Sequence, residues 1–151
     1  MHRLALARFA QTAGEAFSGQ GGILGHGRWH TRGQRVVYTA ETISLAMAEA
    51  LVHLQRSENV APFCRWSIDV PEAAIDTARP LPASWARDQR LTRALGDSWL
   101  ASKRSVALRV PSALVPEESN VLLNPAHPSF SFQWIRGGPI EFRFDARLTA
   151  P

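Results

Sequence analysis

Three side chains capable of chemistry lie within one stretch, GHGRWHTRGQRVVYTAETISLAMAEALVHL, residues 25–54. Arg28 follows glycines, Tyr38 ends a β-branched run, and Glu49 lies in the middle of an apolar segment. An ionised carboxylate among apolar side chains is costly unless it is paired or faces a polar cavity, so Glu49 is a candidate functional group. Arginine offers planar, bidentate contacts to phosphate or carboxylate. The pattern predicts a cleft that contains a cation, an aromatic ring and an acid.

Each of these residues also has a structural interpretation. Glu49 could be paired with a core arginine or lie at the edge of its helix. Arg28 could belong to a surface loop with Trp29 packed beneath it, and Tyr38 could be an ordinary strand aromatic. The pattern alone leaves both interpretations open.

The elements that must position these residues follow one another directly. Residues 35–40 (RVVYTA) predict a short strand, and residues 42–54 predict a helix capped by Thr39 or Thr42. Apolar residues surround this helix on a helical wheel, which predicts a helix buried on all sides. A strand that leads straight into a helix, with the preceding loop folded over the junction, brings the three side chains together.

The rest of the chain predicts a mixture of strands and helices. Residues 12–27 contain six glycines and predict a long loop or short turns, and residues 71–85 predict a proline-rich connection. A helix is expected over 87–102 with Leu91, Leu95 and Trp99 facing inward. Strands are expected over 2–9, 63–70, 105–112, 120–125, 130–135 and 140–148, the last two joined by a turn at RGGP, residues 136–139. Since strands and helices do not alternate regularly, we predict a single α+β domain over residues 1–151.

Composition narrows the class of protein. The 151 residues are 45% hydrophobic and 20% charged, which is typical of a folded globular domain. The apolar stretch at 43–54 is too short to span a membrane and the N-terminus does not resemble a signal peptide, so we expect a cytoplasmic protein. The net charge is +4, and Lys103 is the only lysine among 17 basic residues. This arginine excess favours anion recognition at defined sites, with a nucleic-acid surface as the alternative.

Cysteine and histidine give little support for a metal site. The single cysteine, Cys64, excludes an internal disulfide and is expected to be a small buried residue. His26 and His30 are four residues apart but do not form an H-E-x-x-H motif. We expect no bound metal.

Two blocks of sequence resemble the RES-domain family, the toxin components of bacterial Xre–RES toxin–antitoxin modules. They are GRWHTRGQRVVYTAETISLAMAEALVHL and LRVPSALVPEESNVLLNPAHPSF, and the resemblance extends from Arg8 to Leu148. The arginine, glutamate and serine for which the family is named fall here on Arg28, Glu49 and Ser112. One departure is HGRWH, where the family often reads G-G-R-W-N.

The resemblance implies an ADP-ribosyltransferase-like fold, with a mixed, partly split β-sheet and flanking helices, and NAD as the substrate. It implies that Arg28, Tyr38 and Glu49 are catalytic. It also implies that Arg8, Arg28, Tyr38 and Ser112 bind the dinucleotide. The expected reaction is cleavage of the nicotinamide–ribose bond by hydrolysis or phosphorolysis. Transfer of ADP-ribose to a protein is the alternative, and a non-catalytic nucleic-acid or anion-binding module is a second alternative.

The resemblance further implies a partner, an Xre-type helix-turn-helix antitoxin that blocks the active site. We expect no direct nucleic-acid binding and no membrane association. Without the resemblance, Ser112 would be interpreted as a turn residue. Asn120, Asn124 and His127 are expected to organise a loop.

Overall fold

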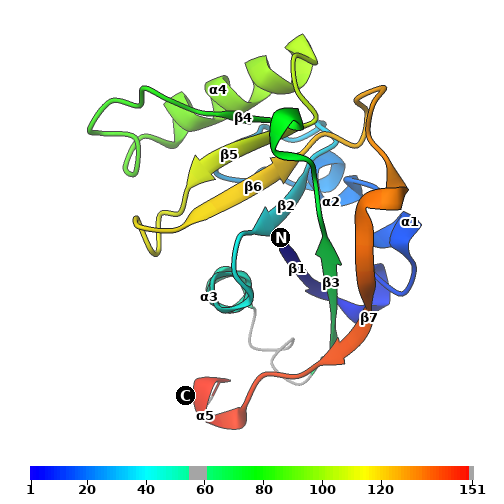
Figure 1. Ribbon diagram of the computed structural model, residues 1–151. Coiled ribbons are helices and arrows are strands. Elements are labelled where there is room, and N and C mark those ends of the chain that lie inside the picture. Colours follow the sequence, from blue (N-terminus) through cyan, green and yellow to red (C-terminus); the bar gives the residue numbers. More distant parts are fainter. Residues whose placement is uncertain (55–60, 150–151) are drawn as a thin grey trace.

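The computed structural model describes residues 1–54 and 61–149, which form one seven-stranded mixed sheet with short helices around it (Figure 1). The strand order is β4-β5-β6-β2-β1-β3-β7. The strands are β1 (His2–Leu6), β2 (Val37–Ala40), β3 (Phe63–Ile68), β4 (Ile75–Thr77), β5 (Ala107–Pro111), β6 (Ser119–Leu123) and β7 (Ile135–Phe142). The α-helices of the described residues are α1 (Ala13–Ala16), α2 (Gln20–Leu24), α3 (Ile43–His53), α4 (Gln89–Ser102) and α5 (Ala146–Thr149).

The sheet is split between β1 and β2. These strands pair only at His2 and Ala40, whereas β1 pairs with β3 at five successive positions. Beyond the single pair, the buried guanidinium of Arg3 donates a hydrogen bond from Nη1 to the carbonyl oxygen of Tyr38, at 3.0 Å. Burial lowers the pKa of Arg3 to about 10. The side chain of Arg3 therefore adds a second link between β1 and β2, beside their one backbone pair.

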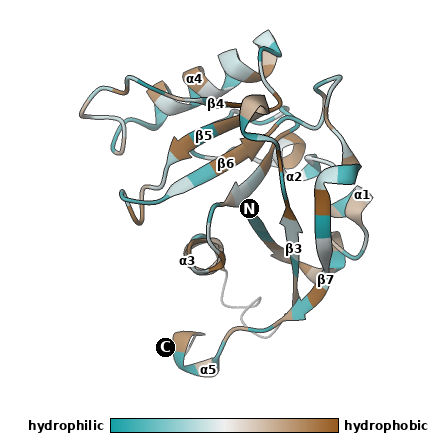
Figure 2. Ribbon diagram, viewed as in Figure 1, coloured by the Kyte–Doolittle hydropathy of each residue, from teal (hydrophilic) through white to brown (hydrophobic). Residues whose placement is uncertain are grey.

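Two apolar clusters cover opposite faces of the β4-β5-β6-β2 half of the sheet. Alternate residues of a strand point to opposite faces, so Val37 and Val121 enter one cluster while Leu108 and Leu122 enter the other. The second cluster includes Trp99 of α4, which crosses above β4 and β5 in Figure 1. Hydrophobic segments run along the central strands in Figure 2, as expected for strands covered on both faces.

The fold confirms the predicted α+β class and the partly split sheet, and it fits an ADP-ribosyltransferase-like architecture. The predicted loop at 12–27 contains α1 and α2, and the predicted connection at 71–85 contains β4. The predicted turn at RGGP is wrong, because residues 136–139 continue through the strand β7. Residues 130–131 precede a short 3-10 helix and form no strand.

The prediction that α3 is buried on all sides is also wrong. Leu45 and Ala46 are buried, but Val52 is 61% exposed. The helix begins after Thr42, whose hydroxyl accepts from the Leu45 amide at 3.1 Å, as one of the two expected caps. In α4, Trp99 is buried as predicted, whereas Leu95 is 38% exposed. Both helices therefore leave apolar side chains at the surface.

None of the helices in the described ranges combines the length and the apolar character that crossing a membrane requires.

Candidate active site

Glu49 is held by two hydrogen-bond donors that reach the same carboxylate oxygen. Its Oε1 accepts from the hydroxyl of Ser112 at 2.9 Å and from the side-chain amide of Asn120 at 2.6 Å. No described residue donates a hydrogen bond to Oε2. The side chain is half-buried, so the carboxylate is oriented by the protein and keeps one oxygen for a ligand.

Strand register explains why these donors meet the glutamate. Asn120 pairs with Ala40 and with Val110, and Tyr38 pairs with Leu122, so Asn120 and Tyr38 share one face of the sheet. Ser112 follows β5 by one residue and has the same parity as Val110. The buried Ser112 hydroxyl also accepts the amides of Leu114 and Val115, at 3.1 and 3.2 Å. Its single proton is therefore directed to Glu49.

The turn between β5 and β6 also fixes the position of α3. At the start of the helix, Thr42 donates to the Glu118 carboxylate at 2.6 Å. Val115 packs against Leu45 and Ala46, the buried face of the helix. The segment between β5 and β6 thus contacts α3 at its N-terminus, along its buried face and at Glu49.

Tyr38 has its hydroxyl fixed by the loop that precedes β2. The hydroxyl accepts from the Trp29 amide at 3.1 Å and shares a hydrogen bond with His30 Nδ1 at 2.8 Å. His30 Nε2 lies 3.2 Å from the carbonyl oxygen of Gly25, so Nε2 carries a proton and Nδ1 accepts from Tyr38. Burial is the main cause that raises the Tyr38 pKa and lowers the His30 pKa, and the charge of Glu49 also raises the Tyr38 pKa. Both groups are therefore neutral near pH 7.

Arg28 lies on the same loop and contacts the segment before α4. Its Nη1 donates to the carbonyl oxygen of Ala86 at 2.8 Å, and the next residue, Trp29, stacks on Trp85 with ring centroids 5.9 Å apart. Arg28 has no carboxylate partner in the part of the chain that the structure describes. Its half-buried guanidinium therefore keeps further donors for an anion.

Arg8 lies two residues beyond the end of β1, outside the strand in which it was predicted. It belongs to the 3-10 helix Ala7–Phe9, is exposed, and has its guanidinium carbon 4.9 Å from the centroid of the Phe9 ring. Its contact with a dinucleotide stays a prediction.

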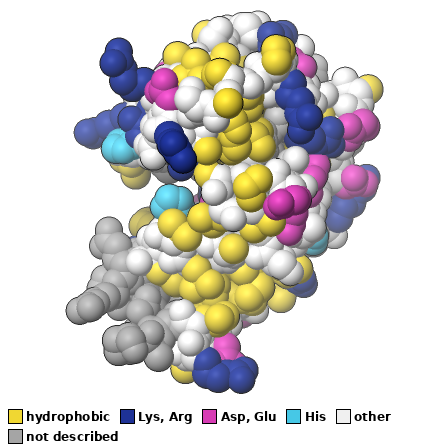
Figure 3. Space-filling view, turned by 90° about the vertical axis from the view of Figure 1, so that its left-hand side faces the viewer, with side chains coloured by type: hydrophobic (Ala, Val, Ile, Leu, Met, Phe, Trp, Pro, Cys, Tyr) yellow, Lys and Arg dark blue, Asp and Glu magenta, His cyan; other side chains and the backbone are white. Residues whose placement is uncertain are grey.

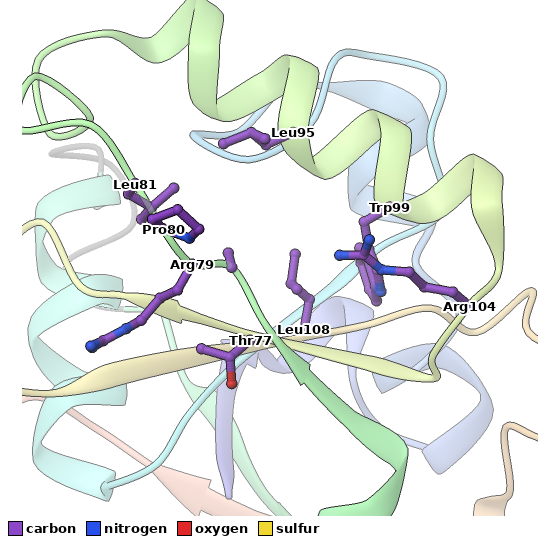
Figure 4. Close-up of a pocket in the computed structure, with 9 residues that line it drawn as sticks. Thr77, Arg79, Pro80, Leu81, Leu95, Trp99, Arg104 and Leu108 are labelled. Carbon is purple, nitrogen blue, oxygen red and sulfur yellow. The ribbon is translucent and has the colours of Figure 1, made fainter.

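The surface is indented at the left of Figure 3, below a part of the molecule that carries arginine and histidine side chains. A small pocket lies between α4 and the strands β4 and β5, where Trp99 comes from α4, Leu108 from β5, and Arg79 and Arg104 lie on opposite sides (Figure 4). None of the predicted site residues lines that pocket.

The cation and the carboxylate have the chemistry to bind a polar, anionic ligand, although no described contact joins Arg28 to Glu49. An arginine with unused donors binds phosphate, and an oriented carboxylate oxygen accepts from hydroxyl groups or faces a developing positive charge. Among the described residues, no group of three or more histidine, cysteine, aspartate or glutamate side chains could hold a metal ion.

Comparison with known proteins identifies the family of the chain. The RES domain family profile matches residues 2–145. The chain belongs to the RES-domain family.

Two of three curated relatives match nearly the whole chain of this RES domain. It is 36% identical to the protein named Toxin Res of Yersinia enterocolitica, over 98% of both chains. It is 37% identical to Toxin Res of Photorhabdus laumondii, over 98% of this chain and 96% of the relative. It is 39% identical to a protein of Sphingobium sp. named Prs ADP-ribosylating toxin, over 74% of this chain and 73% of the relative.

Two residues that contact the predicted site, Asn120 and His30, were not predicted to belong to it. Asn120 begins the predicted strand at 120–125 and was expected to organise a loop, but in β6 it contacts Glu49 instead, while Asn124 and His127 do organise the following loop. The parity of Asn120 with the buried Leu122 could have shown that it faces the sheet interior. His30 supports Tyr38, and no periodic pattern in its glycine-rich surroundings could have indicated this contact.

Proposed function

We propose that this RES domain is a toxin enzyme that cleaves the bond between nicotinamide and ribose in NAD. The observation that carries the proposal is the Glu49 carboxylate, which has two donors on Oε1 and none on Oε2 from residues 1–54 and 61–149. Arg28 lies in the loop before β2, Tyr38 lies in β2, and Glu49 follows in α3. This is the Arg–Tyr–Glu order that the family resemblance implies.

The chemistry requires a negative charge more than a proton donor. When the ribose C1′–N bond breaks, its electron pair goes to the pyridinium nitrogen and nicotinamide leaves as a neutral molecule. The sugar becomes an oxocarbenium-like cation, as in glycoside cleavage. Glu49 Oε2 would accept a hydrogen bond from a ribose hydroxyl and stabilise the positive charge as it develops at C1′. Water, phosphate or a protein side chain then supplies the pair of electrons that forms the new bond to C1′, and a nucleophile that carries a proton, such as water, loses it to solvent.

Binding is assigned to the arginines and the aromatic ring. Arg28, and Arg8 with it, would hold the pyrophosphate through charge-assisted hydrogen bonds. The Tyr38 ring, fixed at its hydroxyl, would form a wall of the nicotinamide pocket. Ser112 acts mainly by orienting Glu49, and its direct contact with NAD stays a prediction.

The names of the relatives support a toxin role and a neutralising partner. The Yersinia and Photorhabdus proteins are each named Toxin Res. We propose that an Xre-type antitoxin covers the cleft of this chain and keeps NAD from it, in the cytoplasm.

The test is to incubate the purified protein with NAD and to separate the products by chromatography, with and without inorganic phosphate. We expect free nicotinamide in equal amount to the NAD lost, together with ADP-ribose, or its 1-phosphate when phosphate is present. If neither condition releases nicotinamide, the proposal is wrong.

A second candidate reaction is transfer of ADP-ribose to a protein. It is favoured by the printed name of the Sphingobium relative, an ADP-ribosylating toxin. With NAD labelled in its adenylate half and a bacterial extract, this reaction would leave label covalently attached to one protein band. Label recovered only in small molecules would exclude it.

A further inference from the structure

Four residues on one face of α4 contact the backbone of the loop that carries Arg28. Arg93 Nε donates to the carbonyl oxygen of Gly27 at 2.9 Å, and the Thr92 hydroxyl donates to the carbonyl oxygen of Arg28 at 2.6 Å. The Asp97 carboxylate accepts from the amide and hydroxyl of Thr31, at 3.0 and 2.8 Å. Gly96 faces the carbonyl group of Trp29 so closely that a Cβ would overlap it.

Apart from the Thr31 hydroxyl, these contacts reach main-chain atoms, and they involve Gly27, Arg28, Trp29 and Thr31 of the loop. Positions 92, 93, 96 and 97 lie on one face of a helix because they are separated by one turn. The helix therefore binds the loop over the whole segment Gly27–Thr31, on both sides of Arg28. Since Trp29 and its neighbour His30 also fix the Tyr38 hydroxyl, the same loop links α4 to two of the predicted site residues.

Of the four α4 residues, Thr92 is the one that contacts the backbone of Arg28 itself. It is fully buried, and its hydroxyl lies closer to the Arg28 oxygen than to the helix carbonyl oxygens of Asp88 and Gln89, at 3.4 and 3.3 Å. Because a hydroxyl has one proton, the 2.6 Å contact takes it. We infer that Thr92 is a positioning residue for substrate binding, which fixes the backbone from which Arg28 reaches the phosphates of the dinucleotide.

The inference rests on the proposed function for the identity of the substrate, and the test is designed to separate the two. Thr92→Val keeps the shape of the side chain and removes the hydroxyl, while Thr92→Ser keeps the hydroxyl. The matched control is Ser98→Ala, which removes an exposed hydroxyl from the same helix. Each variant is compared with wild type for the kcat and KM of NAD cleavage and for the Kd of inorganic pyrophosphate by calorimetry.

We expect Thr92→Val to raise KM and the pyrophosphate Kd about tenfold while kcat falls no more than about twofold, because displacement of a positioned group weakens its contacts. Thr92→Ser and Ser98→Ala should stay within about twofold of wild type in all three quantities. A purely structural role would lower the yield of folded protein and leave KM unchanged.

Equal KM and Kd values in folded Thr92→Val and wild type would overturn the inference. If Thr92→Val does not fold, Thr92→Ala replaces it, because it also removes the hydroxyl that donates to the Arg28 carbonyl oxygen; the same rise in KM and Kd is expected, and its absence overturns the inference. Weaker pyrophosphate binding in the variant without NAD cleavage by wild type would retain the inference and remove the proposed function. A wild-type protein that neither cleaves NAD nor binds pyrophosphate would overturn both.

Discussion

Ser112 and Glu49 are 63 residues apart in the chain, yet the serine hydroxyl donates to Oε1 of the glutamate at 2.9 Å. The serine also accepts two backbone amides from the turn that follows it, so the direction of its proton is determined. Asn120 adds a second donor to the same oxygen. The glutamate of α3 is therefore oriented by the strands β5 and β6 and by the turn between them.

The Asn120 amide is expected to matter for catalysis. Asn120→Ala leaves Glu49 with one donor and a freer side chain, so we expect kcat for NAD cleavage to fall about tenfold, a typical effect of losing one oriented hydrogen bond. Ser119→Ala is the control, because Ser119 is the neighbouring residue of the same strand and faces the other way. Steady-state kinetics of both variants measure the effect, and an Asn120→Ala enzyme with wild-type kcat would contradict it.

Arg28 is expected to act in binding. Removal of its guanidinium in Arg28→Ala should raise KM for NAD at least tenfold, since a charge-assisted contact to phosphate contributes about 1.5–3 kcal/mol. Arg32→Ala is the matched control, because Arg32 is an exposed arginine of the same loop. The two KM values decide the question, and equal values would show that Arg28 does not contact the substrate.

Gly96 and Gly21 give a paired prediction on stability. Alanine normally favours a helix over glycine by about 1 kcal/mol, and nothing lies within 4 Å of a Cβ at Gly21. At Gly96 the Cβ would overlap the Trp29 carbonyl group. We expect Gly96→Ala to lower the free energy of unfolding by about 1–3 kcal/mol, as overpacking does, and Gly21→Ala to leave it unchanged or raise it. Urea unfolding of both variants tests this prediction. A stabilised Gly96→Ala protein would show that α4 does not pack tightly against the loop at Trp29.

His30 is expected to make stability depend on pH. Burial lowers its pKa in the folded chain below the ordinary value of 6.5, so the unfolded chain binds the proton first. The stability that His30 contributes is therefore present above pH 6.5 and is lost as the pH falls below it. We expect wild type to lose more unfolding free energy than His30→Gln between pH 7.5 and about pH 5. His2, whose pKa is also lowered, is present in both proteins and cancels in the difference. Parallel pH profiles would contradict the assignment.

The local parts of the site could be predicted from sequence, because they depend on neighbours in the chain. The strand at Tyr38, the cap at Thr42 and the helix around Glu49 follow from short patterns. The exposure of Val52 could not be predicted, since a helical wheel records which faces are apolar and not which of them the fold covers.

The long-range parts of the site depend on strand order. The contact of Ser112 and Asn120 with Glu49 requires β5 and β6 to lie beside β2, which no single segment specifies. From sequence alone, a glycine such as Gly96 inside a helix only weakens that helix. It instead permits the approach of Trp29, a contact made across 67 positions of sequence that only the folded chain brings together. The strand β7 was divided in two because glycine and proline usually mark turns, whereas here they lie in an edge strand.

The central claim is that the Glu49 carboxylate stabilises the charge that develops on the ribose, and single-turnover release of nicotinamide from enzyme-bound NAD tests it most directly. The comparison is between Glu49→Gln, which keeps the size and the hydrogen-bonding oxygen, and Glu117→Gln, an exposed glutamate of the β5–β6 turn. We expect Glu49→Gln to slow nicotinamide release about 10²–10³-fold with NAD affinity within about threefold of wild type, and Glu117→Gln to match wild type. A folded Glu49→Gln protein that releases nicotinamide at the wild-type rate would contradict the account.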